Sequence, residues 1–496
     1  MSAEWTFALH ALKKYWGYPS FRPPQDQVVK ALIAKQDTFV FLPTGYGKSV
    51  CFQVPALLGS GVTLVISPLI ALMEDQVQDL QTREIAAAAL HGELSKLERK
   101  QVLTNLERNR LRLLYLAPET LFSAAVWTRL QDPRVGINAL MIDEAHTLVH
   151  WGDSFRPDYR RLGAVRAGLH KHFPVAAFTA TADPYTRQVL QQVLQLQQPQ
   201  IIQVDPLRAN LHLRVATTCT PADRKRRLLH YLRQQPGTTG LIYVRTRVEA
   251  RSLHSWLQEQ GFQTAAYHGG LASEKRRELE QAWLAGDCKF LICTNAFGMG
   301  INKADVRWVA HYQAPMSVTD YIQEVGRGGR DGKVSTAFML VSEPTGWLDP
   351  GDRQRQAFFL SQKQKIQTKA SRLLQSLPAV GHLDELVAAQ GREVKVALAL
   401  LHQAGCLQWQ DPFHFQLMQR PQHLPDLRPK HMDRLFADPL YAMEHFIQSR
   451  ECRWQALLRC FGCEAGDPCG NCDNCQRSYG SYSRYKIFGI DRTSTL

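Results

Sequence analysis

The sequence lacks the features that would anchor a chain in a membrane or export it from the cell. No apolar run approaches the roughly 20 residues that a transmembrane helix needs. Residues 1–18 contain no basic segment leading into an apolar one, as a secretory signal would require. Internal repeats and low-complexity tracts are also missing. We therefore expect a globular cytoplasmic protein with no membrane partner.

Acidic residues are in deficit. Asp and Glu number 45 against 59 for Lys and Arg, so the net charge is +14 and the pI is about 9.3. A surplus of that size favours a polyanionic partner, because neutralising phosphates releases counterions. Charge alone still leaves open a soluble protein that is merely basic.

Cysteine is sparse over most of the chain and crowded at one end. Five of the 11 cysteines are scattered and are expected to be buried thiols, namely Cys51, Cys219, Cys288, Cys293 and Cys406. The other six are Cys452, Cys460, Cys463, Cys469, Cys472 and Cys475. In a cytosolic chain such a cluster indicates a metal site before disulfide bonds.

Short apolar runs recur along most of the 496 residues, a length that suggests about three domains. They alternate with longer amphipathic stretches, as in buried parallel strands joined by crossover helices. The predicted strands of the first series are Thr38–Leu42, Val62–Ser67, Leu111–Leu116, Ala139–Ile142 and Val175–Thr179. Those of the second are Gly240–Val244, Thr264–Tyr267, Phe290–Cys293, Val306–Tyr312 and Ser335–Val341. The fold class is therefore α/β, with two tandem parallel-sheet domains joined around residues 205–213.

The pattern changes after Val341. Residues 342–352 have linker composition, and residues 354–377 are predicted to be helical. Two short helices at 382–390 and 393–403, followed by a hairpin turning at Asp411–Pro412, indicate a winged-helix-like module. The predicted domains are 1–205, 206–345, a linker and helix at 346–378, the winged-helix-like module at 379–425, a metal-binding module at 426–480 and a tail at 481–496.

Residues 39–49 predict a strand that runs into a phosphate loop and then into a helix. Gly45 and Gly47 let backbone N–H groups curl around phosphates, Lys48 can reach the β- and γ-oxygens, and the Ser49 hydroxyl can hold Mg²⁺. The strict pattern asks for glycine where Leu42 stands. A chance Gly-Lys-Ser turn is therefore the alternative for this loop alone.

Residues 139–146 predict an apolar strand that ends in Asp143-Glu144. One carboxylate at that position can hold the Mg²⁺ that bridges the β- and γ-phosphates, and a second can orient the attacking water and take its proton. We assign the metal role to Asp143 and the base role to Glu144.

Residues 321–332 place Gln323, Arg327 and Arg330 at intervals of four and three in the second domain. If the segment begins as a helix, Gln323 and Arg327 share one face. An arginine from a second domain stabilises charge on a transferred γ-phosphoryl group, an effect worth roughly 10³–10⁵ in rate. A solvated Gly/Arg-rich surface is the alternative, and the two preceding segments argue against it.

In this order, the segments resemble the RecQ family of helicases. The resemblance covers roughly residues 15–340 and includes segments 17–25, 65–76, 114–119, 178–182, 265–271 and 293–303. It implies two RecA-like domains that grip ATP between them, with Thr44 in the phosphate loop. Tyr18 and Arg22 would flank the adenine, and Gln25 would bond its edge. It also implies an ATP-dependent DNA helicase that moves 3′ to 5′ on single-stranded DNA and unwinds duplexes in recombination, repair or replication.

Residues 150–159 are rich in aromatic side chains and lie just after the acidic pair. RecQ proteins carry an aromatic-rich loop here, which implies DNA contacts for Trp151, Phe155 and Arg156. Base stacking on such side chains is worth ~1–3 kcal/mol per base. Core packing is the alternative.

The C-terminal cysteines contain CxxCxxC spacing at Cys469, Cys472 and Cys475. Four thiolates form a closed structural site for Zn²⁺, and the RecQ pattern carries over to these three with Cys452 as the fourth. An iron–sulfur cluster is the alternative, although the Cys-Pro expected after such a run is missing. Cys460 and Cys463 are either substitute ligands or neighbours.

The resemblance breaks at the winged-helix-like module. In longer RecQ proteins that module follows the zinc module, and a small helical DNA-binding domain often comes last. Here the module comes first, and about twenty residues follow Cys475. We therefore expect a short form without that last domain and assign no strand-separating residue.

The alternatives in function are an RNA-directed helicase and an ATP-gated DNA-binding or annealing protein. The expected partners are single-stranded and duplex DNA together with single-strand-binding or repair proteins. A monomer associated with a bacterial nucleoid is expected.

Overall fold

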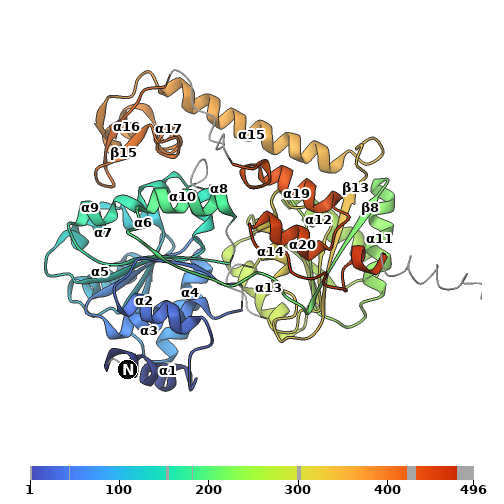
Figure 1. The fold of residues 1–496 in the computed structure, drawn as a ribbon, viewed down its shortest axis with the longest axis horizontal. Helices are drawn as coiled ribbons and strands as arrows, with labels where there is room; N and C mark the ends of the chain where they lie inside the picture. Colours follow the sequence, from blue (N-terminus) through green and yellow to red (C-terminus); the bar gives the residue numbers. More distant parts are fainter. Residues whose placement is uncertain are drawn as a thin grey trace, which may run out of the picture. The chain divides into compact units, whose positions relative to one another are not determined.

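The computed structural model describes residues 3–43, 45–151, 156–180, 183–298, 303–421 and 432–477. It contains two compact units, coloured along the chain in Figure 1. The first unit comprises residues 1–204 with 358–432, and the second comprises residues 205–357 with those from 433 onward. No helix in the described part of the chain is long and apolar enough to span a membrane.

The first unit is built on a seven-stranded parallel sheet in the order β3-β4-β2-β5-β6-β1-β7. Its strands are β1 Thr38–Phe41, β2 Val62–Ile66, β3 Ala87–Leu90, β4 Leu113–Leu116, β5 Ile137–Ile142, β6 Val175–Thr179 and β7 Gln200–Gln203. Successive residues of β1 enter opposite hydrophobic layers, with Phe39 and Phe41 on one face and Val40 on the other. Burial on both faces explains why the strands appear in the sequence as continuous apolar runs.

Helices cover both faces of this sheet (Figure 1). They are α1 Ala3–Trp16, α2 Gln25–Ile33, α3 Lys48–Leu58, α4 Ile70–Thr82, α5 Lys96–Glu107, α6 Pro118–Leu121, α7 Ala124–Gln131, α8 His146–Trp151, α9 Val165–Leu169 and α10 Pro184–Leu194, with a 3₁₀ helix η1 at Pro157–Ala164. Local signals set several starts. For example, α5 begins at a capping box in which Ser95 and Glu98 bond each other's backbone N–H.

The second unit contains a six-stranded parallel sheet in the order β10-β11-β9-β12-β13-β8. Its strands are β8 Leu211–Thr218, β9 Gly240–Tyr243, β10 Thr264–Tyr267, β11 Phe290–Cys293, β12 Trp308–His311 and β13 Ser335–Ser342. The helices are α11 Pro221–Arg233, α12 Arg247–Glu259, α13 Ser273–Ala285 and α14 Val318–Val325. The two predicted strand series are confirmed, and three further strands were missed.

The missed strands β3, β7 and β8 lie at sheet edges. β3 is three alanines and a leucine, a composition with little strand preference, and β7 has exposed glutamines at both ends. β8 alternates buried and exposed residues, and its first residues fall in the segment predicted to join the domains. None of the three therefore has the continuous run of strand-forming apolar residues by which the other strands were identified.

Residues 380–418 form the predicted winged-helix-like module, which follows the long helix α15 Gly351–Leu373. Its antiparallel sheet has the order β14-β16-β15. The elements are β14 Val380–His382, α16 Leu383–Gln390, α17 Glu393–Gln403, β15 Leu407–Trp409 and β16 His414–Leu417, so the two short helices and the hairpin are confirmed.

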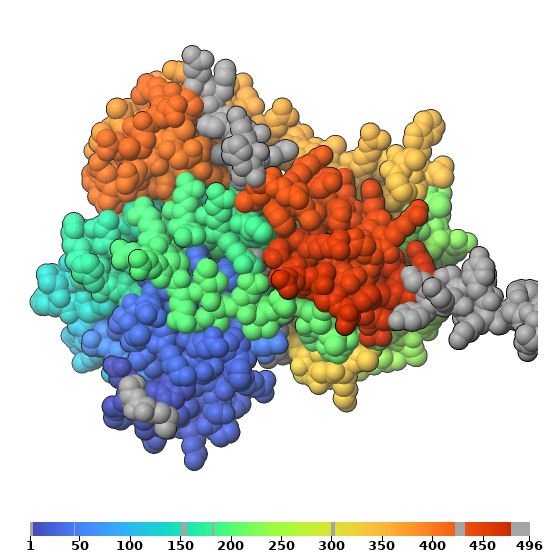
Figure 2. All heavy atoms as spheres, viewed as in Figure 1, coloured from blue at the N-terminus to red at the C-terminus, as the bar shows by residue number. Residues whose placement is uncertain are grey.

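This module packs against the first sheet domain, with α17 beside η1 and α10. Figure 2 shows its surface, in orange, against the green atoms of that domain. Arg161 donates hydrogen bonds to the Pro412 carbonyl at 2.8 Å and to Asp158 at 2.6 Å. Lys395 donates to both oxygens of Asp158 at 3.2 Å, and the Phe413 ring lies 5.4 Å from that of Trp127.

The docked parts are the second helix and the hairpin tip. The second helix of a helix–turn–helix is the one that normally enters the major groove of DNA. In this arrangement α17 is largely buried against the chain itself. The hairpin tip therefore acts as a docking element within the first unit.

The cysteine-rich segment forms α18 Arg434–Ala437, α19 Pro439–Gln448 and α20 Arg453–Cys460. In Figure 1 these helices, in red, lie beside α14 and β8, and they share one hydrophobic core with them. The buried indole N–H of Trp454 donates to the Leu211 carbonyl at 3.0 Å. The cysteine module is thereby an integral part of the second unit.

Candidate active site and cysteine cluster

The carboxyl ends of three adjacent parallel strands, β5, β6 and β1, bring the predicted phosphate-handling loops together. The Leu42 N–H donates to the Thr179 carbonyl at 3.0 Å, and the Ala145 N–H donates to the Phe178 carbonyl at 2.8 Å. Loops that follow neighbouring parallel strands meet at one edge, where ligands bind in open α/β sheets.

The phosphate loop has the backbone shape that its glycines predict. Gly45 and Gly47 have φ of 89° and 69°, in the left-handed region, and Gly47 immediately precedes α3. Lys48 and Ser49 form the first turn of that helix, whose free N–H groups favour an anion. Thr44 lies outside the described residues.

Gln25 connects the predicted adenine segment to this loop. Its buried side chain donates to the Tyr46 carbonyl at 2.7 Å and accepts from the Arg22 N–H at 3.0 Å. A Cβ at Gly47 would lie 2.7 Å from the Gln25 amide nitrogen, so a side chain there would displace Gln25 as well as strain the backbone at φ of 69°. Tyr18 and Arg22 are exposed, as residues that flank a planar base would be.

The acidic pair faces the lysine. Lys48 Nζ lies 3.2 Å from Glu144 Oε1, and the Glu144 N–H donates to Asp143 Oδ1 at 2.9 Å. Glu144 has φ of 47°, a conformation that residues other than glycine seldom adopt and that concentrates at functional sites. Burial raises the pKa of Asp143 to about 6, and the charge of Glu144 adds to the rise. A divalent cation would relieve the repulsion between the carboxylates, so the donor set fits Mg²⁺.

The third predicted element lies in the second unit. Gln323 is on α14, which ends at Val325, so Arg327 occupies the following turn instead of sharing a helical face with Gln323. Arg327 Nε donates to the Tyr243 hydroxyl at 2.8 Å, and its Nη1 donates to the Gly298 carbonyl. Arg330 Nε donates to the Gly326 carbonyl at 3.5 Å, at the limit of a hydrogen bond.

Of the predicted DNA-contacting residues, Arg156 is described. Its Nη1 donates to the Pro68 carbonyl at 2.7 Å, and its Nε lies 3.5 Å from Glu119. Both partners belong to segments that carry the helicase resemblance. Phe155 and the side chain of Trp151 lie outside the described residues, so their roles stay predictions.

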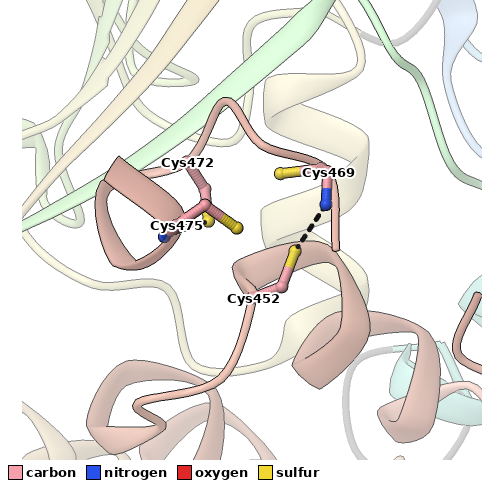
Figure 3. A group of neighbouring side chains, drawn as sticks. All are labelled: Cys452, Cys469, Cys472 and Cys475. Carbon is pink, nitrogen blue, oxygen red and sulfur yellow. Dashed lines mark hydrogen bonds between the residues drawn. The ribbon is translucent and has the colours of Figure 1, made fainter. Parts of the chain in front are cut away.

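Cys452, Cys469, Cys472 and Cys475 form a compact group (Figure 3). Their sulfur atoms all lie within 4.8 Å of one another. Backbone N–H groups donate to the Cys452 sulfur from Cys469 at 3.2 Å and to the Cys472 sulfur from Arg453 at 3.3 Å. Four converging thiols with such N–H donors fit a tetrahedral thiolate site for Zn²⁺.

Cys460 and Cys463 lie outside this group of four. The buried Cys460 thiol donates to the Ala456 carbonyl at 3.3 Å, within its own helix. The geometry thus favours neighbouring thiols over substitute ligands.

Sequence reasoning missed two contributors to these sites. His146 Nδ1 lies 3.1 Å from the Thr179 hydroxyl and so links the loops after β5 and β6, although both residues stand in recognisable segments. Tyr243 ends an apolar strand and carries no sequence signal of its own. Only the position of Arg327 reveals it.

Family models match along most of the chain. A DEAD/DEAH box helicase model covers residues 22–189, a helicase conserved C-terminal domain covers 223–332, and a RecQ zinc-binding model covers 416–476. The ATP-dependent DNA helicase RecQ of Synechocystis is 50% identical over 471 residues, which cover 93% of this chain and 96% of that protein. The chain belongs to the RecQ family of ATP-dependent DNA helicases. Both RecA-like domains and the zinc-binding module of RecQ proteins are present.

More distant relatives agree. The mouse ATP-dependent DNA helicase Q5 is 38% identical, over 72% of this chain and 37% of that protein. Among solved structures, yeast Dbp5 bound to RNA and ADP BeF3 matches with a TM-score of 0.56 at 19% identity, over 74% of this chain and 91% of that one. The Mycobacterium smegmatis helicase Lhr bound to single-stranded DNA and AMP-PNP has a TM-score of 0.54 at 18% identity, over 84% of this chain and 60% of that one. At such identities these structures show the shared RecA-like fold alone.

Proposed function

We propose that this RecQ chain hydrolyses ATP at the edge of its first sheet and uses the cycle to move along single-stranded DNA and separate duplexes. The observation that carries the proposal is the convergence of Lys48, Asp143 and Glu144 beside a phosphate loop. The relatives in this family are named ATP-dependent DNA helicases, which supports ATP hydrolysis as the reaction at this site.

The roles follow from charge and reach. Lys48 leaves Glu144 and binds the β- and γ-phosphate oxygens, and Glu144 is then free to orient the attacking water and accept its proton. Ser49 and Asp143 would hold Mg²⁺, which neutralises phosphate charge when bound. Gln323, Arg327 and Arg330 of the second unit complete the site when the lobes close on the nucleotide.

Adenine recognition is assigned to the segment before α2. Tyr18 and Arg22 flank the base, and Gln25 bonds its edge. Because Gln25 also contacts the carbonyl of Tyr46, base recognition is tied directly to the shape of the phosphate loop. Thr44, Gly45 and Gly47 supply the remainder of the cradle.

DNA is the proposed track, in single-stranded and duplex form. The net charge of +14 suits a phosphate backbone, and Trp151, Phe155 and Arg156 are assigned to the contact that couples DNA to hydrolysis. The contacts of Arg156 with Pro68 and Glu119 would pass a DNA-induced shift to neighbouring loops. Polarity of 3′ to 5′, a monomeric state, a nucleoid location and single-strand-binding or repair partners stay predictions from the family.

The cysteine cluster is proposed to hold Zn²⁺ in a structural role. Its four thiols are built into the core shared by α20 and β8, remote in sequence from the phosphate-handling residues. When bound, zinc would cross-link the loop at 469–475 to the start of α20. With four thiolate ligands it would have no open coordination position for catalysis.

The test is strand displacement on 3′- and 5′-tailed DNA duplexes and on matched RNA duplexes. Wild type should separate the DNA duplex that carries one tail polarity, and Lys48→Ala should not. Lys100→Ala, an exposed lysine on α5, is the matched control and should behave as wild type. DNA-stimulated hydrolysis without displacement would instead indicate an ATP-gated annealing protein, and preference for RNA would overturn the DNA assignment.

A further inference from the structure

The guanidinium of Arg327 sits in a cradle made by its own lobe. Nε donates to the Tyr243 hydroxyl at 2.8 Å, and Nη1 donates to the Gly298 carbonyl. The Tyr243 hydroxyl in turn donates to the Phe297 carbonyl at 3.2 Å, which fixes its own orientation. Two of the nitrogen positions of the arginine are thus held by groups with defined directions.

The cradle requires a glycine. Gly298 has φ of 124°, which side-chain-bearing residues rarely adopt, and a Cβ there would overlap the Arg327 guanidinium. The close approach of the arginine to this backbone therefore depends on the absence of a side chain.

The ring of Tyr243 is itself held in place by neighbouring side chains. Tyr243 is fully buried at the end of the central strand β9, and its ring stacks on His311 with centroids 5.5 Å apart and planes 18° apart. The His311 Nε2 bonds Glu324 at 2.8 Å, and Glu324 accepts from both terminal nitrogens of Arg245, at 3.1 and 2.9 Å.

This buried network anchors the end of α14, three residues before Arg327. Burial opposes ionisation of Glu324, but the charge of Arg245 and the hydrogen bond to His311 hold its pKa at about 2. Glu324 is therefore a fixed carboxylate at neutral pH. Both the backbone and the guanidinium of Arg327 are then set by the same lobe.

Preorganisation of this kind matters for an arginine that stabilises a transition state. The transition state is stabilised by hydrogen-bond donors that already point to the place where charge develops. A displacement of such a donor by about 1 Å can lower the rate roughly 10²-fold. Ordinary core packing would account for the buried ring of Tyr243. It would not account for a hydroxyl directed at the Nε of Arg327.

We propose that Tyr243 is a positioning residue for ATP hydrolysis: its hydroxyl holds Arg327 so that the remaining edge of the guanidinium is presented to the γ-phosphate. The inference rests on the proposed function of Arg327 and deepens it. Tyr243 itself need not touch nucleotide or DNA.

The test is Tyr243→Phe in the full chain, which removes the hydroxyl and keeps the ring. With saturating single-stranded DNA we expect kcat to fall about 10- to 100-fold, while KM for ATP stays within about twofold. Tyr231→Phe is the matched control, because Tyr231 is also buried in this lobe but stacks on Phe338, with ring centroids 4.4 Å apart. The control should retain wild-type kcat.

A double-mutant cycle separates positioning from a merely structural role. If Tyr243 acts through Arg327, then Tyr243→Phe combined with Arg327→Ala loses no more kcat than Arg327→Ala alone. Gly298→Ala provides a second route, since its Cβ displaces the guanidinium while the tyrosine is kept, and it should give the same fall in kcat with KM unchanged. This variant carries the test should Tyr243→Phe fail to fold.

The outcomes are distinguishable. A large effect of Arg327→Ala with wild-type kcat in Tyr243→Phe would overturn the inference and leave the proposed function standing. Additive losses in the double variant, or a rise of kcat in Tyr243→Phe, would also overturn it. An unchanged kcat in Arg327→Ala would remove the proposed role of Arg327 and the inference together.

Discussion

The ammonium group of Lys48 lies 3.2 Å from Oε1 of Glu144, and both side chains are largely buried. This ion pair joins the phosphate loop to the end of β5. Each partner is assigned to a different part of the triphosphate reaction, so nucleotide binding must break the pair before either acts.

We expect Glu144→Gln to bind ATP at least as tightly as wild type and to hydrolyse it about 10²- to 10⁴-fold more slowly. The amide cannot accept the proton of water, and it also frees Lys48 from its ion pair. Stopped-flow binding of a fluorescent ATP analogue, together with steady-state hydrolysis, measures the two effects. Asp26→Asn, at an exposed ion pair with Lys30 on α2, is the control. Wild-type turnover in Glu144→Gln would remove Glu144 as the base.

The zinc content of the protein should depend on the four clustered cysteines. We expect about one zinc ion per chain in wild type and a marked loss in Cys472→Ser, because Cys472 is buried within the group. Elemental analysis of anaerobically purified protein measures this. Cys463→Ser is the matched control and should keep its zinc, whereas a brown, iron-containing wild type would contradict the assignment.

Removing the metal should also destabilise the second unit. Cys472 and Cys475 share a core with Trp454 and Leu211, so loosening the cluster loosens α20 against β8. Each kcal/mol lost lowers Tm by about 2–4 °C in a domain of 150–250 residues. A chelator-treated sample whose Tm does not fall would contradict a structural role.

The docking of the winged-helix-like module should depend on Arg161. We expect Arg161→Ala to cost about 1–3 kcal/mol, because it releases the Pro412 carbonyl and leaves Asp158 paired with Lys395 alone. Hydrogen exchange across α17 should rise in this variant. Arg392→Ala, exposed just before α17, should leave exchange unchanged. Equal protection of α17 in both variants would show that docking does not need Arg161.

Acid should weaken the same interface through His402. Burial and the charge of Arg160 lower the pKa of His402 to about 3, from about 6.5 in an unfolded chain. Between these values the unfolded state binds the extra proton, so stability falls as pH drops below 6.5. At pH 5 the loss reaches about 2 kcal/mol.

We therefore expect His402→Leu to lose less stability than wild type when the pH is lowered from 7.5 to 5. Chemical denaturation at the two pH values measures this difference. His170→Leu, a histidine exposed after α9, is the control and should keep the wild-type pH dependence. Identical pH dependence in His402→Leu and wild type would contradict a buried neutral imidazole.

Part of this molecule can be predicted from local sequence. Apolar runs of strand length identified most of the strands, because strands buried on both faces leave a signal that does not depend on their partners. Glycine at positions 45 and 47 and the CxxCxxC spacing were equally informative, since each answers a local demand of backbone shape or ligand geometry. Residue types at fixed spacing therefore determined the family and the candidate chemistry.

The tertiary structure decided what depends on contacts between distant segments. It placed β6 between β5 and β1, ended α14 before Arg327, separated Cys460 from the four clustered thiols and buried α17 against η1. It also paired Tyr243 with Arg327, 84 residues apart. No periodicity or spacing in the sequence marks these relationships, because each one arises only when elements that are distant in the sequence pack together. The sequence thus specified which groups are available, and packing determined which of them meet.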